Sequence, residues 1–275
     1  MLRHIQLETV SDVSGAISHV EYPLPRTNAT FNTTNENISW ATWTWNPVTG
    51  CLHNCEYCYA REIALASKIN FPVGFTPLFH HERLNAPKNT HLPNDASPSA
   101  RRVFVCSMAD LYGRWVPASW IDKVHAACIA NPQWEYLFLT KFPQRYVGMK
   151  LPPTAWIGTT VDRQYRVKIA EEAFSKISGV RIKWLSCEPL LEPLAFNDLS
   201  LWDWVIIGAQ TGTMQPQGYV PRFTPPLEWV TRLTEQAHKA GCKVWHKPNL
   251  PKFPGFVQEF PATLPTLGTQ GSLFT

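Results

Sequence analysis

Short apolar segments alternate with amphipathic segments along most of this chain. The apolar segments are rich in β-branched and aromatic residues and too short for helices, which indicates buried strands. They are residues 38–46, 101–107, 134–140, 155–161, 181–190, 202–210 and 242–247. Helical patterns lie at residues 59–69, 117–130, 162–177 and 225–241. Since parallel strands need crossover connections of this kind, the order predicts an α/β fold with a partial or complete parallel (β/α) barrel of six to seven strands.

The segments outside this alternation set the expected domain organisation. Residues 1–37 are polar and are predicted to form an irregular N-terminal arm, residues 38–250 the barrel, and residues 251–275 a C-terminal tail. Residues 71–100 are rich in Pro, Asn and His and have no periodicity, so we predict a long loop after the first helix that caps the barrel. A G-x-G-x-x-G motif does not follow the first strand, which argues against a dinucleotide-binding fold.

Composition limits the class of protein. The chain has 275 residues, 44% of them hydrophobic, and no apolar run near the roughly 18 residues that a membrane span needs. Its first residues lack the apolar core of a signal peptide, so we expect a cytoplasmic protein without a membrane partner. A net charge of +4 and twelve tryptophans permit a nucleic-acid partner without requiring one, and they do not indicate an oligomeric state.

Polar residues stand where the predicted strands end. The active site of a β/α barrel lies at the carboxyl ends of its strands, so these positions are candidate site residues. They are Ser107, Asp110, Thr140, Lys141, Thr159, Thr160, Cys187, Glu188, Gln210, Thr211, His246 and Lys247.

Three of the seven cysteines, Cys51, Cys55 and Cys58, fall in one loop directly after the first predicted strand. In a reducing compartment such a group indicates a metal site or redox chemistry. Zinc would need a fourth ligand, for which His53 is the nearest candidate. An iron–sulfur cluster held by three thiolates would instead leave one iron open to a substrate or cofactor.

The segment "GCLHNCEYCYAR" resembles the C-x3-C-x2-C motif of the radical S-adenosylmethionine (radical SAM) superfamily, with Tyr57 as the aromatic residue before the last cysteine. The chain is also similar to a phage- and plasmid-associated family of radical-SAM-like proteins. The segments that carry this similarity are "TWNPVTGC", "CYAR", "FHHERL", "VFVCSMADLYG", "WIGTTV", "LSCEPLL" and "DWVIIGAQTG". The cysteine segment further resembles spore-photoproduct-lyase-like DNA repair enzymes.

The resemblance implies a barrel of radical SAM type in which the three cysteines hold a 4Fe-4S cluster. The open iron would bind S-adenosyl-L-methionine, which is cleaved reductively to a 5′-deoxyadenosyl radical. The residues assigned to cofactor binding are Tyr57, Ser107, Asp110, Thr159, Glu188 and Gln210. The segment "CSMAD" departs from the family's Gly-Gly-Glu-like segment, so either Ser107 or Asp110 would contact the amino group, while Asp110 could alternatively cap the next helix.

Two further groups of residues receive roles. Cys187 and Lys141 are assigned to catalysis, although a lone buried cysteine more often serves packing. The residues assigned to the substrate are His80, His81, Arg83 and Lys247. Solvated loop positions are the alternative for these.

The sequence therefore predicts a radical SAM enzyme that acts on a nucleic-acid base, in modification or repair. One alternative is a radical SAM enzyme that acts on a small molecule, a peptide or a protein partner. The other is a non-enzymatic module, stapled by zinc or a cluster, that binds nucleic acid. Either enzyme would need an electron donor such as a reductase, a flavodoxin or a ferredoxin.

Overall fold

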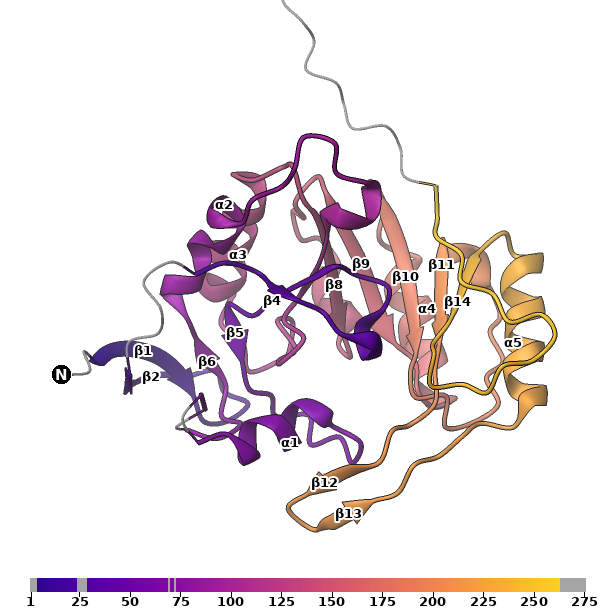
Figure 1. The fold of residues 1–275 in the computed structure, drawn as a ribbon, viewed down its shortest axis with the longest axis horizontal. Helices are drawn as coiled ribbons and strands as arrows, with labels where there is room; N and C mark the ends of the chain where they lie inside the picture. The colour runs from indigo at the N-terminus through magenta and orange to yellow at the C-terminus, as the bar shows by residue number, and fades with distance from the viewer. Residues whose placement is uncertain (1–3, 24–28, 69, 72, 263–275) are drawn as a thin grey trace, which may run out of the picture.

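The computed structural model describes residues 4–23, 29–68, 70–71 and 73–262, and its centre is a mainly parallel sheet (Figure 1). All seven predicted strands are present, and they lie side by side in chain order and parallel to one another. They are β4 (Trp43–Trp45), β7 (Arg102–Val105), β8 (Glu135–Thr140), β9 (Ala155–Thr160), β10 (Ile182–Cys187), β11 (Trp204–Ile207) and β14 (Lys243–His246). The predicted α/β fold with a large parallel sheet is confirmed.

The sheet does not close into a barrel. Within the described residues its two edge strands are β14 and β3 (Asn32–Thr33), and β3 runs antiparallel to β4. The expectation of a complete barrel is therefore wrong, because closure requires the first and last strands to pair. The eight-stranded sheet is open.

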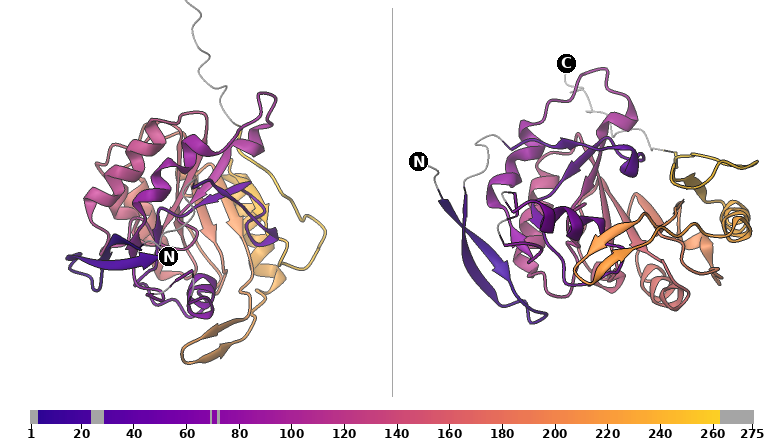
Figure 2. Two further views of the ribbon diagram at one scale, coloured as in Figure 1. Left: turned by 60° about the vertical axis from the view of Figure 1, so that its left-hand side comes forward. Right: turned by 60° about the horizontal axis from the view of Figure 1, so that its bottom comes forward.

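Helices cover one face of this sheet, as Figure 2 shows from two further sides. The four predicted helices are present with shorter bounds: α1 (Tyr59–Ala66), α3 (Ala118–Ile129), α4 (Tyr165–Phe174) and α5 (Leu227–Lys239). Only short 3-10 turns lie between β8 and β9 and between β10 and β11, namely η4 (Pro143–Tyr146) and η5 (Leu199–Leu201). Some crossovers thus lack the helix that a regular barrel would place there.

The two faces of the sheet pack against different cores, and residues two apart in a strand share a face. On the helical face, Val205 and Ile207 of β11 join a core with residues of α3, α4 and α5. On the inner face, Trp204 and Ile206 of β11 join a cluster rich in tryptophan. Its other tryptophans are Trp40, Trp156, Trp184 and Trp245.

The predicted irregular N-terminal arm is instead an ordered hairpin for residues 4–23. Strand β1 (His4–Val10) pairs antiparallel with β2 (Ile17–Pro23). Together with β5 (Val48–Thr49) and β6 (Leu78–Phe79) they form a four-stranded sheet. Leu7 of β1 packs with Tyr22 of β2 and Leu78 of β6 in a small apolar cluster, which holds the hairpin to this sheet. A 3-10 turn, η1 (Glu36–Ile38), precedes β4.

Residues 71–100 do not form the predicted long cap loop. The segment contains β6, η2 (His81–Asn85), α2 (Ala86–Asn89) and η3 (Pro98–Arg101). The indole nitrogen of Trp45 donates to the Arg83 carbonyl, and that of Trp134 donates to the Pro87 carbonyl. The segment therefore packs along the β4 side of the sheet towards the start of β8, where indole donors satisfy its backbone carbonyls.

Of the predicted C-terminal tail, the structure describes residues 251–262, and residues 263–275 lie outside the described part of the chain. Its residues return along β14, since the Val257 carbonyl accepts from the His246 backbone nitrogen at 2.9 Å. The carbonyl of Glu259 also accepts from the Trp204 indole at 2.9 Å. No helix in the described part of the chain is long and apolar enough to cross a membrane.

Candidate functional site

A cavity of about 470 Å³ lies at the carboxyl ends of the parallel strands, as expected for this sheet. Its wall is built from the cysteine loop, α1, residues that precede β4, the end of β9 and the segments that follow β7, β8, β10, β11 and β14. The lining residues used below are Cys51, His53, Cys55, Tyr57, Cys58, Ser107, Asp110, Lys141, Thr160, Ser186, Glu188, Gln210 and Lys247.

The cysteine loop places all three of its thiol residues on the cavity wall. Gly50 begins the loop with φ +83°, and a Cβ there would lie 2.2 Å from the Thr76 carbonyl oxygen, so only glycine fits. The loop ends where Cys58 caps α1, its sulfur accepting from the Arg61 backbone nitrogen at 3.4 Å. The thiols of Cys51 and Cys58 thus stand at the two ends of a fixed turn.

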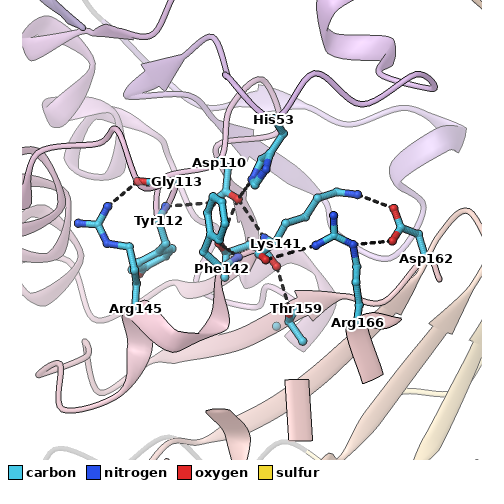
Figure 3. Close-up of polar contacts among 12 residues, drawn as sticks. His53, Asp110, Tyr112, Gly113, Lys141, Phe142, Arg145, Thr159, Asp162 and Arg166 are labelled. Carbon is cyan, nitrogen blue, oxygen red and sulfur yellow. Dashed lines mark hydrogen bonds and ion pairs between the residues drawn. The ribbon is translucent and has the colours of Figure 1, made fainter. Parts of the chain in front are cut away.

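Asp110 fastens the middle of the cysteine loop to the sheet (Figure 3). Its Oδ2 contacts His53 Nε2 at 2.6 Å and accepts from the Lys141 backbone nitrogen at 2.9 Å and from Thr140 Oγ1 at 3.0 Å. Its Oδ1 accepts from the Tyr112 backbone nitrogen at 3.0 Å. Four protein groups therefore occupy this carboxylate, which favours a role in positioning His53 over direct cofactor contact.

Tyr57, Lys141, Asp162 and Arg166 form a second anchor, here called the cavity cluster. The Tyr57 hydroxyl donates to Asp162, and the Lys141 ammonium donates to both, at 2.7 Å from Asp162 Oδ2. Arg166 forms an ion pair with the other oxygen of Asp162 at 2.8 Å (Figure 3). These residues come from the cysteine loop, from the segments that follow β8 and β9 and from α4, so the cluster ties the loop to two strand ends and a helix.

Burial and charge shift the titration of the groups around the loop. Burial raises the pKa of the Cys51 thiol, and the nearby Asp110 carboxylate adds to that shift. Burial also raises the pKa of the Cys58 thiol, and burial together with Asp162 raises the pKa of Tyr57. Burial acts to raise the pKa of Asp162 too, but the Lys141 ammonium and the Tyr57 hydroxyl hold it below its usual value.

The donor set fits an iron–sulfur cluster better than a zinc ion. Within the described residues, no three His, Cys, Asp or Glu side chains are grouped so that they could hold one metal ion. His53, the candidate fourth zinc ligand, already contacts Asp110 through Nε2. A cluster needs no common point, because each thiolate binds a different iron. Three soft donors on one cavity wall satisfy that requirement.

Glu188 and Lys247, from the ends of β10 and β14, form an ion pair in the cavity wall. Gly208 makes room for the pair, since a Cβ there would lie 2.9 Å from Lys247 Cδ and 3.1 Å from Glu188 Cγ. Lys141, which follows β8, pairs with Asp162 and not with Glu188. Lys247 therefore carries its own counter-charge and is not an unpaired anchor for an anion.

Two other predicted cofactor contacts also line the cavity. The Ser107 hydroxyl accepts from Thr44 Oγ1 at 2.6 Å and donates to Asn46 Oδ1 at 3.2 Å. Gln210 donates through Nε2 to the Pro221 carbonyl at 2.7 Å. Both side chains are held by the protein at the edge of the cavity.

Thr159 and Cys187 were predicted as site residues, but neither lines the cavity. Thr159 is buried and donates to the Thr140 carbonyl at 2.9 Å, and Cys187 is fully buried in the core of the helical face. Their neighbours Thr160 and Ser186 line the cavity instead. The error follows from the two-residue period of a strand, which turns adjacent side chains to opposite faces.

His80, His81 and Arg83 were predicted to face the substrate, but these described side chains also lie outside the cavity wall. His80 contacts Thr49 Oγ1 at 2.9 Å, and burial lowers its pKa to about 4. His81 pairs with Glu8 of β1 at 3.1 Å. Arg83 donates to the Asn46 carbonyl at 3.0 Å. His80 and His81 thus contact strands of the four-stranded sheet, and Arg83 joins η2 to the residue that follows β4 of the large sheet.

Sequence reasoning missed Arg61 and Gln215, which contact the cysteine loop from behind. Arg61 donates to the Cys55 carbonyl at 3.3 Å, and Gln215 donates to the Cys58 carbonyl at 2.9 Å. Gln215 belongs to a hairpin formed by β12 (Thr213–Gln215) and β13 (Gly218–Val220). The place of Arg61 in "CYAR", directly after the last cysteine of the motif, was a readable signal, whereas nothing local in the sequence marks Gln215.

Comparison with known proteins places the fold. The model of the family described as "Protein of unknown function (DUF5131)" matches residues 35–249. No curated protein matches the chain. A spore photoproduct lyase double mutant with bound AdoMet and dinucleoside spore photoproduct is similar over 80% of this chain and 79% of its own, with 12% identity and a TM-score of 0.50. A single mutant of that enzyme shares 13% identity over 81% of both chains, with a TM-score of 0.49. At this identity the likeness to the double mutant concerns the fold.

Proposed function

This chain belongs to the DUF5131 family, and from its cavity we propose that it is a radical SAM enzyme that acts on a nucleic-acid base. The observation that carries the proposal is the placement of Cys51, Cys55 and Cys58 on one cavity wall at the carboxyl edge of the parallel sheet. The motif spacing and the resemblance to radical SAM proteins agree with it. The narrower relationship to a phage- and plasmid-associated family stays a prediction.

The three thiols would hold a 4Fe-4S cluster, and Ser107, Glu188 and Gln210, which line the same cavity, would contact S-adenosyl-L-methionine. The cluster and S-adenosyl-L-methionine together would supply a 5′-deoxyadenosyl radical that abstracts a hydrogen atom. The chain's own contribution is positioning. Asp110 and the cavity cluster fix the loop.

A nucleic-acid base is the substrate class that the cavity wall favours. Trp40 and Phe104 give it apolar aromatic surface, and Asn35, Asn37 and Asn249 add amide donors and acceptors. Aromatic surface with a few amides suits a flat heterocycle, which stacks and forms hydrogen bonds at its edge. The net charge of +4 is compatible with a polyanion. A small molecule, peptide or protein substrate is the alternative.

Cofactor cleavage tests the enzyme proposal. The protein is reconstituted anaerobically with iron and sulfide, reduced with dithionite and supplied with S-adenosylmethionine, and 5′-deoxyadenosine is measured. We expect product from the wild type and from Cys128→Ala, a buried thiol in α3, but none from the Cys51/Cys55/Cys58→Ala triple variant. Equal amounts of 5′-deoxyadenosine from the wild type and the triple variant would contradict the enzyme proposal. A colourless zinc protein without turnover would support the binding-module alternative.

Binding of oligonucleotides tests the substrate class. We expect affinity for single- or double-stranded oligonucleotides that falls as salt rises, because phosphate contacts release counterions. Negligible affinity at every salt concentration would favour the small-molecule or protein substrate.

The same reconstituted protein, reduced by a flavodoxin or ferredoxin instead of dithionite, tests the proposed electron donor. A cytoplasmic location is part of this proposal, since the cluster needs reduced thiols.

A further inference from the structure

The β12–β13 hairpin reaches from the end of β11 to the back of the cysteine loop. Figure 1 shows the hairpin beside α1, and β12 contacts that helix. Thr213 Oγ1 of β12 donates to Glu62 Oε2 of α1 at 2.8 Å. Two segments separated by about 150 residues are therefore joined at the start of α1.

Gln215 is the hairpin residue that contacts the loop itself. Its side-chain nitrogen donates to the Cys58 carbonyl at 2.9 Å and to Thr213 Oγ1 at 3.1 Å, and its oxygen accepts from Arg61 at 3.2 Å. The side chain is only 4% exposed. Both ends of the amide are engaged, so its orientation is fixed.

Arg61 extends this contact to a second cysteine. The same NH1 that donates to Gln215 also donates to the Cys55 carbonyl at 3.3 Å, and the residue is 8% exposed. Its guanidinium carbon lies 5.7 Å from the centre of the Phe75 ring. A buried cation and a buried amide thus hold the carbonyls of two of the three thiol residues.

The hairpin also borders the cavity. Gln210, Thr211 and Gly212 line the cavity directly before β12 begins. Along β12 the side chains alternate, Thr213 and Gln215 being buried and Met214 being 54% exposed. A molecule in the cavity would therefore touch the segment that leads, within a few residues, to the contact with Cys58.

We infer that Gln215 and Arg61 are positioning residues that set the orientation of Cys55 and Cys58 and place a positive charge beside the proposed cluster. The inference rests on the proposed function. A cation beside an iron–sulfur cluster makes addition of an electron easier, and hydrogen bonds around the ligands have the same effect. The hairpin also borders the cavity. It therefore connects the part of the wall that a substrate would contact with the residues that set the redox potential of the cluster.

Hydrogen–deuterium exchange of the metal-free protein tests the positioning part. Gln215→Ala should speed exchange of peptides covering residues 51–62 by roughly tenfold, since local opening becomes easier when about one hydrogen bond is lost. Gln215→Glu should speed it less, because the carboxylate still accepts from Arg61. Met214→Ala is the control, since its side chain lies on the opposite face of the same strand. Equal exchange in Gln215→Ala and Met214→Ala would overturn the inference.

A redox titration of the reconstituted protein, followed by its absorbance and the EPR signal of the reduced cluster, tests the electrostatic part. Gln215→Glu should shift the midpoint potential furthest towards negative values, because it adds an anion, and Gln215→Ala should shift it less. The two variants thus rank in opposite order in the two measurements. Arg61→Gln should also lower the potential, and Arg61→Lys should restore most of it by keeping the charge.

These outcomes separate the inference from the proposed function. If wild-type protein takes up no cluster, the proposed function fails, and the electrostatic part of the inference fails with it. If the wild type takes up the cluster but both measurements rank the Gln215 variants in the same order, the residue has a structural role alone and only the inference fails. If Gln215→Ala does not fold, the comparison of Gln215→Glu, Arg61→Lys and Met214→Ala gives the same decision.

Discussion

Two groups of buried and half-buried polar residues flank the cysteine loop, and they differ in what their side chains face. The cavity cluster, Tyr57, Lys141, Asp162 and Arg166, joins the loop to strand ends, and two of its members line the cavity. The second group, here called the inter-sheet cluster, consists of Thr49, His80, Glu82 and Arg83. In it His80 contacts Thr49 and Glu82, Arg83 pairs with Glu82, and no member lines the cavity.

The contrast shows that position on the sheet predicts a site better than the density of polar residues. The inter-sheet cluster comes from the motif-like segment "FHHERL", yet its side chains fasten one sheet to another. Lys141 is a single residue at the end of an apolar strand, yet it lies at the cavity. Carboxyl strand ends converge by geometry, whereas a polar loop can pack anywhere along the sheet.

The largest effect should come from Asp162→Asn in the cavity cluster. This change leaves the half-buried Lys141 and Arg166 without their buried anion, and breaking a buried pair from one side costs about 3 kcal/mol. Urea unfolding at pH 7 measures the loss. The control is Arg163→Gln, which removes a pair between the exposed side chains of Arg163 and Glu192 and should cost under about 1 kcal/mol. Equal costs would show that the cavity cluster is not a buried anchor.

The same variant should reduce 5′-deoxyadenosine formation by the reconstituted enzyme. Asp162→Asn removes the negative charge that holds Tyr57 and Lys141 together, which weakens one of the contacts that fix the cysteine loop. The variant is assayed at low temperature, where it stays folded. Unchanged product formation would show that the cavity cluster does not contribute to 5′-deoxyadenosine formation. The two clusters would then not differ in function.

The inter-sheet cluster should show itself in the pH dependence of stability. Burial lowers the pKa of His80 from 6.5 to about 4, so between these values the unfolded chain binds more protons than the folded one. Stability from this group is therefore present above pH 6.5 and is lost, by about 3 kcal/mol, as the pH falls to about 4. The pKa of Asp162 is lowered from 3.8, so its contribution is lost only at more acid pH.

His80→Gln tests this window. Urea unfolding from pH 7 to 4 should show a shallower decline in the variant than in the wild type, because part of the decline is removed. His125 and His246, whose pKa values burial also lowers to about 4, keep the rest. Since His80 lies outside the cavity, 5′-deoxyadenosine formation at pH 7 should not change. Parallel declines, or lost product, would contradict the assignment.

Much of the fold could be predicted from the sequence because its strands and helices follow from local patterns of apolar and polar residues. Each parallel strand is a short apolar run, and each predicted helix has an apolar stripe. Closure of the sheet could not be predicted, since it depends on whether β4 and β14 meet. The hairpin of residues 4–23 was predictable in principle, because Ile5 and Leu7 alternate with polar residues and Asp12 accepts from Ser14 in the turn.

The candidate site was predicted in part for the same reason. Strand ends led to Lys141, Glu188 and Lys247, which line the cavity, but not to the pairing among them, which depends on distances across the sheet. The contact between Gln215 and Cys58 is set by where a hairpin lies in space. Long-range contacts of this kind have no local signature in a single sequence.

The smallest effect should separate two adjacent threonines at the end of β9. Thr159 donates to the Thr140 carbonyl on the helical face, whereas Thr160 lines the cavity. Thr159→Val should lower the free energy of unfolding by about 1 kcal/mol, the value of one buried hydrogen bond, and leave product formation unchanged. Thr160→Val should have the smaller effect on stability and weaken formation of 5′-deoxyadenosine. If both variants behave alike in both assays, strand alternation does not decide which residue reaches the cavity. The assignment of Thr160 to the cavity and of Thr159 to the core would then be wrong.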